Sequence, residues 1–178
     1  GVAMDRFLKS KKGPEADLWS MLEKEVYGPI GIHYAPTNRT IEAQGEGQPV
    51  MAFGFYPTIG DLVKIANLYL AGGKHGGEQL LDPERVAEIL DASKTRGLPT
   101  GDAGRPHYFT SFWIGDYEAA GGCSVQYPTM SGWGSNYVPL LPNGISAIRL
   151  ARNWDGDATA HDLDSILAVA DRIAPLCK

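Results

Sequence analysis

The sequence lacks a block of basic residues and a long apolar run. Its 178 residues hold 16 Lys and Arg against 21 Asp and Glu, a net charge of −5. A nucleic-acid partner is therefore not expected, because phosphate binding needs a basic surface. No apolar run approaches the roughly 20 residues of a membrane-spanning helix. The chain length suits one domain that buries roughly 70% of its unfolded surface.

Cysteine is also scarce, since Cys123 and Cys177 are the only two. Two cysteines do not make a disulfide framework, and their spacing fits no zinc pattern. We expect two free thiols, which leaves the redox compartment open.

Metal-binding patterns are incomplete. The four histidines are scattered and form no i, i+4 pair. Residues 153–164 alternate like a calcium loop, but Ala158 stands where such a loop needs Gly, and Asp164 stands where it needs Glu. A solvated turn ahead of a helix explains these acidic residues better. We expect neither a metal nor another cofactor.

Apolar periodicity predicts an α+β fold. Helical spacing appears from residue 1 without an N-cap, which predicts a helix that begins upstream. It recurs over 15–26, from Thr58 to Gly72-Gly73, after Asp82-Pro83, and over 163–173. Strand-like patterns cover 108–117 and 123–129, whereas 33–51 and 91–107 look like loops. We expect one domain, mainly helical over 1–95, with an antiparallel sheet under a terminal helix over 108–178.

The clearest turn signal is Pro142-Asn143-Gly144, because Asn and Gly tolerate positive φ. Apolar and β-branched residues flank it over 137–141 and 145–151, which predicts an antiparallel hairpin. Before the hairpin, small residues surround one Trp in Ser131-Gly132-Trp133-Gly134-Ser135. Such residues on a strand indicate a bulge, or the close approach of a ligand or another backbone.

Met130-Ser131-Gly132 resembles the third motif of serine β-lactamases, penicillin-binding proteins and related esterases. In that family the motif is Lys-Thr-Gly or His-Ser-Gly, on a strand beside the nucleophile, and a hairpin and a C-terminal helix follow. The segment 56–90 and Pro29-Ile30-Gly31-Ile32 resemble other parts of the same family. The sequence departs from the pattern at Met130, which replaces the cation.

The family's other two motifs are absent. No Ser-x-x-Lys occurs, and no Tyr is followed two positions later by Asn or Ser. The resemblance therefore implies the C-terminal half of a serine hydrolase domain, with the nucleophile in a missing N-terminal half. That half, or self-association, is the expected partner.

The resemblance also implies roles for individual residues. Trp133 would give one oxyanion donor, and Ser131 would orient the substrate or relay a proton. The substrate-binding residues would be Met130, Gly132, Gly134 and Ser135. Because Met130 cannot bind a carboxylate, a small neutral ester or amide is the expected substrate. The alternative is a non-catalytic binding module that keeps the fold without its machinery.

Overall fold

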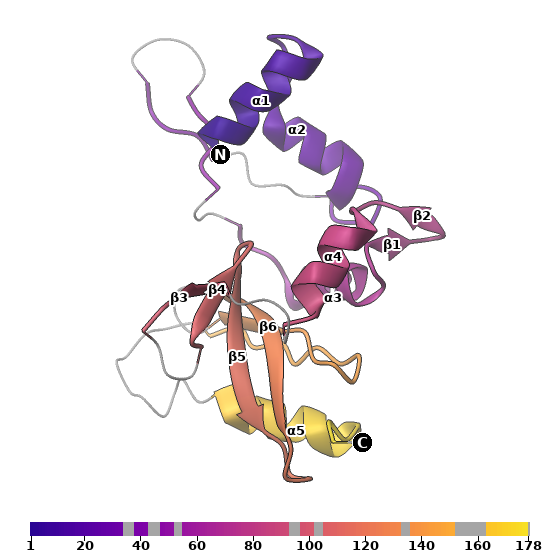
Figure 1. The fold of residues 1–178 in the computed structure, drawn as a ribbon. Coiled ribbons are helices and arrows are strands. Elements are labelled where there is room, and N and C mark those ends of the chain that lie inside the picture. The colour runs from indigo at the N-terminus through magenta and orange to yellow at the C-terminus, as the bar shows by residue number, and fades with distance from the viewer. Residues whose placement is uncertain are drawn as a thin grey trace. The chain divides into compact units, whose positions relative to one another are not determined.

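The computed structural model describes residues 1–33, 38–42, 47–51, 55–92, 97–101, 105–132, 136–151 and 163–177. The chain forms two compact units, Gly1–Lys64 and Ile65–Lys178. The fold is α+β, with several helices, a five-stranded antiparallel sheet and a C-terminal helix (Figure 1), as the sequence predicted. None of the described helices has the length and apolar character needed to cross a membrane.

The first unit begins with three helical segments: α1 (Val2–Lys12), α2 (Leu18–Leu22) and the π-helical turn η1 (Glu23–Tyr27). The helix predicted over 15–26 starts later because the Asp17 side chain caps it, accepting from the Ser20 N–H at 2.8 Å. The helix then continues as the π-helical turn η1, in which the Gly28 N–H donates to the carbonyl of Glu23, five residues earlier, at 2.7 Å.

The helix α3 (Ile59–Leu70) has the predicted start and end. The Thr58 N–H donates to the Asp61 carboxylate at 3.0 Å, and the Asp61 N–H donates back to Thr58 Oγ1 at 3.1 Å. This exchange is the capping box that the sequence indicated. Gly72 and Gly73 follow the helix with φ of 67° and 82°, and the Gly73 N–H donates to the Leu68 carbonyl at 2.8 Å.

A small hairpin and a further helix follow: β1 (Lys74–His75), β2 (Glu78–Gln79) and α4 (Pro83–Leu90). Gly76 and Gly77 join the two strands with φ of 56° and 91°, the positive values that a two-residue turn needs. Asp82 caps α4 as predicted, because its carboxylate accepts from the N–H groups of Glu84 and Arg85.

The sheet has the order β3-β4-β5-β6-β7, and all neighbours are antiparallel. Its strands are β3 (Leu98–Pro99), β4 (His107–Phe109), β5 (Phe112–Glu118), β6 (Ser124–Gly132) and β7 (Asn136–Pro139). The single strand predicted over 108–117 is wrong, because Thr110 and Ser111 take φ of 46° and 69° and turn the chain between β4 and β5. The short strand β3 also lies within a predicted loop.

The helix α5 (Leu163–Ile173) packs on one face of the sheet, which confirms that prediction (Figure 1). Its contact with β6 centres on Tyr127, which is 1% exposed. Burial raises the pKa of the Tyr127 phenol. The buried residues of this core are Ala119, Tyr127, Leu141, Leu167, Ala170 and Leu176.

The predicted turn at Pro142-Asn143-Gly144 is confirmed. The Gly144 N–H donates to the Leu141 carbonyl at 3.0 Å, and Gly144 has a φ of 81°. The returning segment 145–151 forms no continuous strand. It makes isolated bridges, from Ser146 to Leu140 and from Arg149 to Tyr137.

The turn between β5 and β6 repeats this hydrogen-bond pattern. The Gly122 N–H donates to the Ala119 carbonyl at 2.9 Å, and the Ala119 N–H donates to the Cys123 carbonyl at 2.9 Å. Gly122 also has a φ of 81°. Both turns thus close three-residue loops that end in a glycine of positive φ, a common hairpin geometry.

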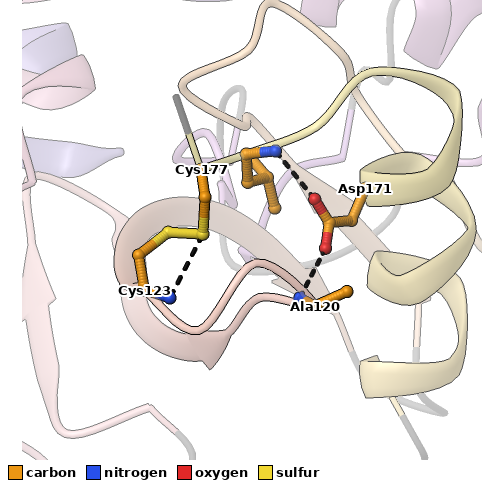
Figure 2. Close-up of a disulfide and its surroundings, with 5 residues drawn as sticks. Ala120, Cys123, Asp171 and Cys177 are labelled. Carbon is orange, nitrogen blue, oxygen red and sulfur yellow. Dashed lines mark hydrogen bonds between the residues drawn. A yellow bond between two sulfur atoms is a disulfide. The ribbon is translucent and has the colours of Figure 1, made fainter.

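The C-terminal end of α5 is fastened to both turns. A disulfide joins Cys123 to Cys177 across 54 residues of sequence (Figure 2), so the expectation of two free thiols is wrong. Sequence spacing could not reveal this pair, because only the packing of α5 on the sheet brings the two residues together. At the second turn, Asn143 Nδ2 donates to the Ala174 carbonyl at 2.6 Å.

Asp171 adds a third link. Its carboxylate accepts from the Leu176 N–H at 2.7 Å and from the Ala120 N–H at 2.8 Å (Figure 2). The Leu176 N–H, followed by the Ala120 N–H, lowers the pKa of Asp171, because both bonds favour the ionised carboxylate. We call the disulfide, the Asp171 bonds and the Asn143 bond the α5 clasp.

Opening the disulfide should destabilise the fold. It closes a loop with a sequence separation of 54 residues, so its reduction should cost about 2–4 kcal/mol of unfolding free energy. Urea unfolding with and without a reductant measures this cost. The double variant Cys123→Ser/Cys177→Ser serves as control and should be insensitive to reductant. A wild-type midpoint that reductant leaves unchanged would contradict the structure.

The Asp171 bonds should make stability depend on pH in the acid range. A lowered folded pKa contributes stability that is complete above the unfolded pKa of about 3.9 and is lost as the pH falls through the folded pKa. The advantage of wild type over Asp171→Asn should therefore be full near pH 6 and shrink below about pH 5. Urea midpoints over a pH series test this, and a difference independent of pH would contradict it.

Candidate functional site

The residues Met130-Ser131-Gly132 form the last part of β6. Pairing with β5 ends at Trp113 opposite Thr129, whereas pairing with β7 continues to Gly132 opposite Asn136. The final residues of β6 therefore extend past the paired part of β5.

The main-chain groups of Ser131 lie on the side away from β7. The Leu140 N–H donates to the Pro128 carbonyl at 2.9 Å, and hydrogen-bonded pairs alternate along an antiparallel ladder. Residues 128, 130 and 132 therefore direct their main-chain groups at β7. The N–H and carbonyl of Ser131 point to the other side, where the pairing with β5 has ended.

The side chains of Met130 and Ser131 lie on opposite faces of the sheet, because side chains alternate along a strand. Ser131 shares its face with its cross-strand partner Tyr137 and with Trp113, whose partner Thr129 lies two residues back along β6. Met130 shares the other face with Val138. The side chains of Met130 and Ser131 therefore do not meet in one site.

Arg105 supplies a cation beside Ser131, which sequence reasoning missed. Its Nη1 donates to Ser131 Oγ at 2.5 Å from 26 residues away. The guanidinium carbon lies 4.9 Å from the ring centroid of Trp113 and 5.7 Å from that of Tyr137. We call Arg105, Trp113, Ser131 and Tyr137 the Arg105 cluster. No linear motif joins these residues, so only the folded chain reveals the cluster.

The main chain around Arg105 is held in place. The Thr100 hydroxyl donates to the Arg105 carbonyl at 2.6 Å, and the Thr100 N–H donates to the Pro106 carbonyl at 3.0 Å. These bonds tie the residue after β3 to the residues before β4. Arg105 therefore projects from a fixed piece of main chain.

The other predicted site residues are Gly132, Trp133, Gly134 and Ser135. Trp133, Gly134 and Ser135 lie outside the described residues. Gly132 is exposed, and a Cβ built on it would meet no atom closer than Asn136 Cβ, at 3.6 Å. The fold therefore has room for a small side chain at Gly132, so any requirement for glycine there would come from a ligand.

Two other kinds of site find no support in the described residues. Among the described residues, no group of three or more His, Cys, Asp or Glu could hold a metal ion. In the first unit, a groove between α1 and α2 includes Ser20 and Asp17. There Ser20 Oγ donates to the Asp17 carboxylate at 2.8 Å as part of the helix cap. This bond serves the helix cap, so we assign no chemistry to the groove.

No protein-family model matches the chain, and no curated protein matches it at a significant level. The likeness of Met130-Ser131-Gly132 to the third motif of serine hydrolases therefore stays a resemblance.

Two glycines of the sheet should respond differently to substitution. A Cβ on Gly115 would lie 2.6 Å from the Tyr127 ring, so Gly115→Ala should displace that buried ring and cost about 1–3 kcal/mol. Gly132→Ala should change the unfolding free energy by no more than about 0.5 kcal/mol, because its surroundings are open. Urea unfolding of both variants tests the comparison. Equal losses would show that β6 is misplaced.

Proposed function

We propose that the chain is the C-terminal portion of a serine hydrolase of the β-lactamase and penicillin-binding-protein type, which cleaves an ester or an amide through an acyl-enzyme. One observation carries the proposal. Met130-Ser131-Gly132 ends strand β6 past the last residue that pairs with β5, and strand β7, a tight turn and a sheet-packed helix follow in the order that the resemblance implies.

In the proposed reaction, a serine outside this sequence attacks the carbonyl carbon of the substrate while a base takes its proton. The leaving group departs with a proton, and water then releases the acid from the acyl-enzyme. The end of β6 would line the cleft. Trp133 would donate its main-chain N–H to the developing oxyanion, and Gly132 would let the acyl group pass close to the strand.

The second candidate is a binding module without catalysis. Two observations favour it: the chain has no Ser-x-x-Lys, and the hydroxyl of Ser131 is already engaged by Arg105. Such a module would still hold a small molecule at the end of β6 but would turn nothing over. Activity of the longest polypeptide that the gene encodes separates the two candidates.

The end of β6 should control the rate in that longest polypeptide. Gly132→Val places a β-branched side chain beside the acyl path and tilts the next N–H, so kcat should fall about 10²–10³-fold, as for the loss of one oxyanion donor. Trp133→Phe keeps the N–H and should mainly change KM. Hydrolysis of nitrophenyl acetate and nitrocefin, with thermal melts of each variant, provides the measurement.

The controls decide between the candidates. Residues 1–178 alone should hydrolyse neither substrate above a buffer blank, since they contain no nucleophile motif. If the longest polypeptide is also inactive on both, the binding module is the better description. If it is active but Gly132→Val keeps the wild-type kcat, the assignment of the third motif is wrong.

A further inference from the structure

The two sulfurs of the disulfide in the α5 clasp are not equivalent. The Cys123 N–H donates to Cys177 Sγ at 3.1 Å (Figure 2), whereas no N–H of the described residues donates to Cys123 Sγ. A hydrogen bond to the ionised form of a group favours that form. When the disulfide opens, Cys177 is therefore the sulfur that carries a negative charge more readily.

The turn between β5 and β6 also covers Cys177 on one side. A Cβ built on Gly121 would lie 2.6 Å from Cys177 Cβ and 2.9 Å from its Sγ. Gly121 does not have a positive φ, so the need for glycine comes from this contact and not from the backbone. The main chain of Gly121 thus shields Cys177. Because both cysteines are only half-buried, a small molecule can still reach the disulfide at Cys123.

Thiol–disulfide exchange depends on which sulfur is attacked. An incoming thiolate bonds to one sulfur of the disulfide, the S–S bond breaks, and its electron pair leaves on the other sulfur. The exchange is faster when the leaving sulfur forms the more stable thiolate. The hydrogen bond and the shielding therefore both direct the attack to Cys123 and make Cys177 the leaving sulfur.

Asp171 keeps the two sulfurs close together after the bond has opened. Its carboxylate binds the N–H of Leu176, the residue before Cys177, and the N–H of Ala120, in the turn that leads to Cys123. Asp171 is 5% exposed, and neither of its bonds involves a sulfur. Both bonds can therefore remain in the reduced chain. The carboxylate is tied to both ends of the pair, so its negative charge does not select one sulfur.

We propose that Cys123 and Cys177 form a reversible modification site for low-molecular-weight thiols, in which Cys123 takes the adduct and Cys177 removes it. The incoming thiolate bonds to Cys123 Sγ, and Cys177 leaves as a thiolate that takes up the proton of the incoming thiol. In the reverse step Cys177 loses this proton, attacks Cys123 Sγ and expels the added thiol, so the disulfide forms again without an oxidant. The site is a redox-sensitive lock on the end of α5, and Asp171 is its positioning residue. The proposal is independent of the hydrolase reaction.

Peptide mapping of residues 1–178 locates the adduct. The oxidised chain is exposed briefly to 2-mercaptoethanol and quenched with N-ethylmaleimide, which blocks the free thiol. Mass spectrometry should find 2-mercaptoethanol on Cys123 and N-ethylmaleimide on Cys177, in about tenfold excess over the reverse, as expected for one hydrogen bond to a charged group. Equal amounts of the two products, an excess of the adduct on Cys177, or no adduct would each overturn the proposal.

Gly121→Ala tests the contact that shields Cys177. The added Cβ crowds the closed disulfide, whereas in the reduced chain Cys177 is free to move away from it. The equilibrium constant for disulfide formation against dithiothreitol should fall about tenfold, which corresponds to about 30 mV. Gly60→Ala is the matched control and should leave the constant unchanged, because a Cβ there would meet no atom closer than 3.5 Å. The same constant in wild type and Gly121→Ala would overturn the assignment of Cys177 as the shielded sulfur.

Asp171→Asn separates positioning from stability. The 2-mercaptoethanol adduct is prepared on Cys123, excess thiol is removed, and its loss is followed in native buffer. The variant should clear the adduct about 3- to 10-fold more slowly than wild type, because its amide accepts the two N–H bonds less strongly than a carboxylate. Asp116→Asn, at an exposed carboxylate on β5, is the matched control and should clear it at the wild-type rate.

Near-UV circular dichroism shows whether each variant keeps its tertiary structure. Clearance at the wild-type rate in folded Asp171→Asn would overturn the positioning role of Asp171, because a merely stabilising residue would leave this rate unchanged. The position of the adduct in the wild-type chain decides the main proposal without this variant.

Discussion

The register of β6 between β5 and β7 is the constraint on which the second unit depends. Side chains alternate along the strand, so Tyr127 and Ser131 share one face while Met130 takes the other. The buried end of that face packs under α5, and the exposed end forms the Arg105 cluster. A slip of one residue would exchange the faces, removing Tyr127 from the core and Ser131 from Arg105. The core therefore sets the geometry of the candidate site.

The α5 clasp protects that register at the far end of the strand. A helix that packs only through an apolar stripe can slide along a sheet, because apolar contacts have little directionality. The disulfide at Cys123, the Asp171 bond to Ala120 and the Asn143 bond to Ala174 are directional, and they join α5 to the two turns at 119–123 and 141–145. They fix α5 over Tyr127. The clasp lies near one end of β6, and the Arg105 cluster lies at the other end. Because both depend on the position of this strand, fixing β6 at the clasp also helps to fix Ser131.

Local signals explain which parts of this fold the sequence could predict. Capping at Thr58 and Asp82, the turn at Asn143-Gly144 and the stripe of α5 each depend on a few adjacent residues, and all of them were confirmed. The misses depend on distant residues or on unusual backbone. Thr110 and Ser111 take a positive φ, which is uncommon for their residue types and could not be predicted from them. Cys123 meets Cys177 only after α5 has packed on the sheet. Arg105 and Ser131 meet only through the sheet.

A motif transferred by its linear pattern alone can misplace the charge of a site. A linear pattern assigns chemistry to adjacent residues, and by that standard Met130 removes the cation from the end of β6. A binding site, however, depends on which atoms lie close together, and Met130 lies on the face opposite Ser131. A cation at that position in sequence would therefore not point along the Ser131 side chain, whereas Arg105, 26 residues away, donates to it directly. Charge at this site is best inferred from the residues that contact Ser131 in the folded chain, because those are the groups a ligand would meet.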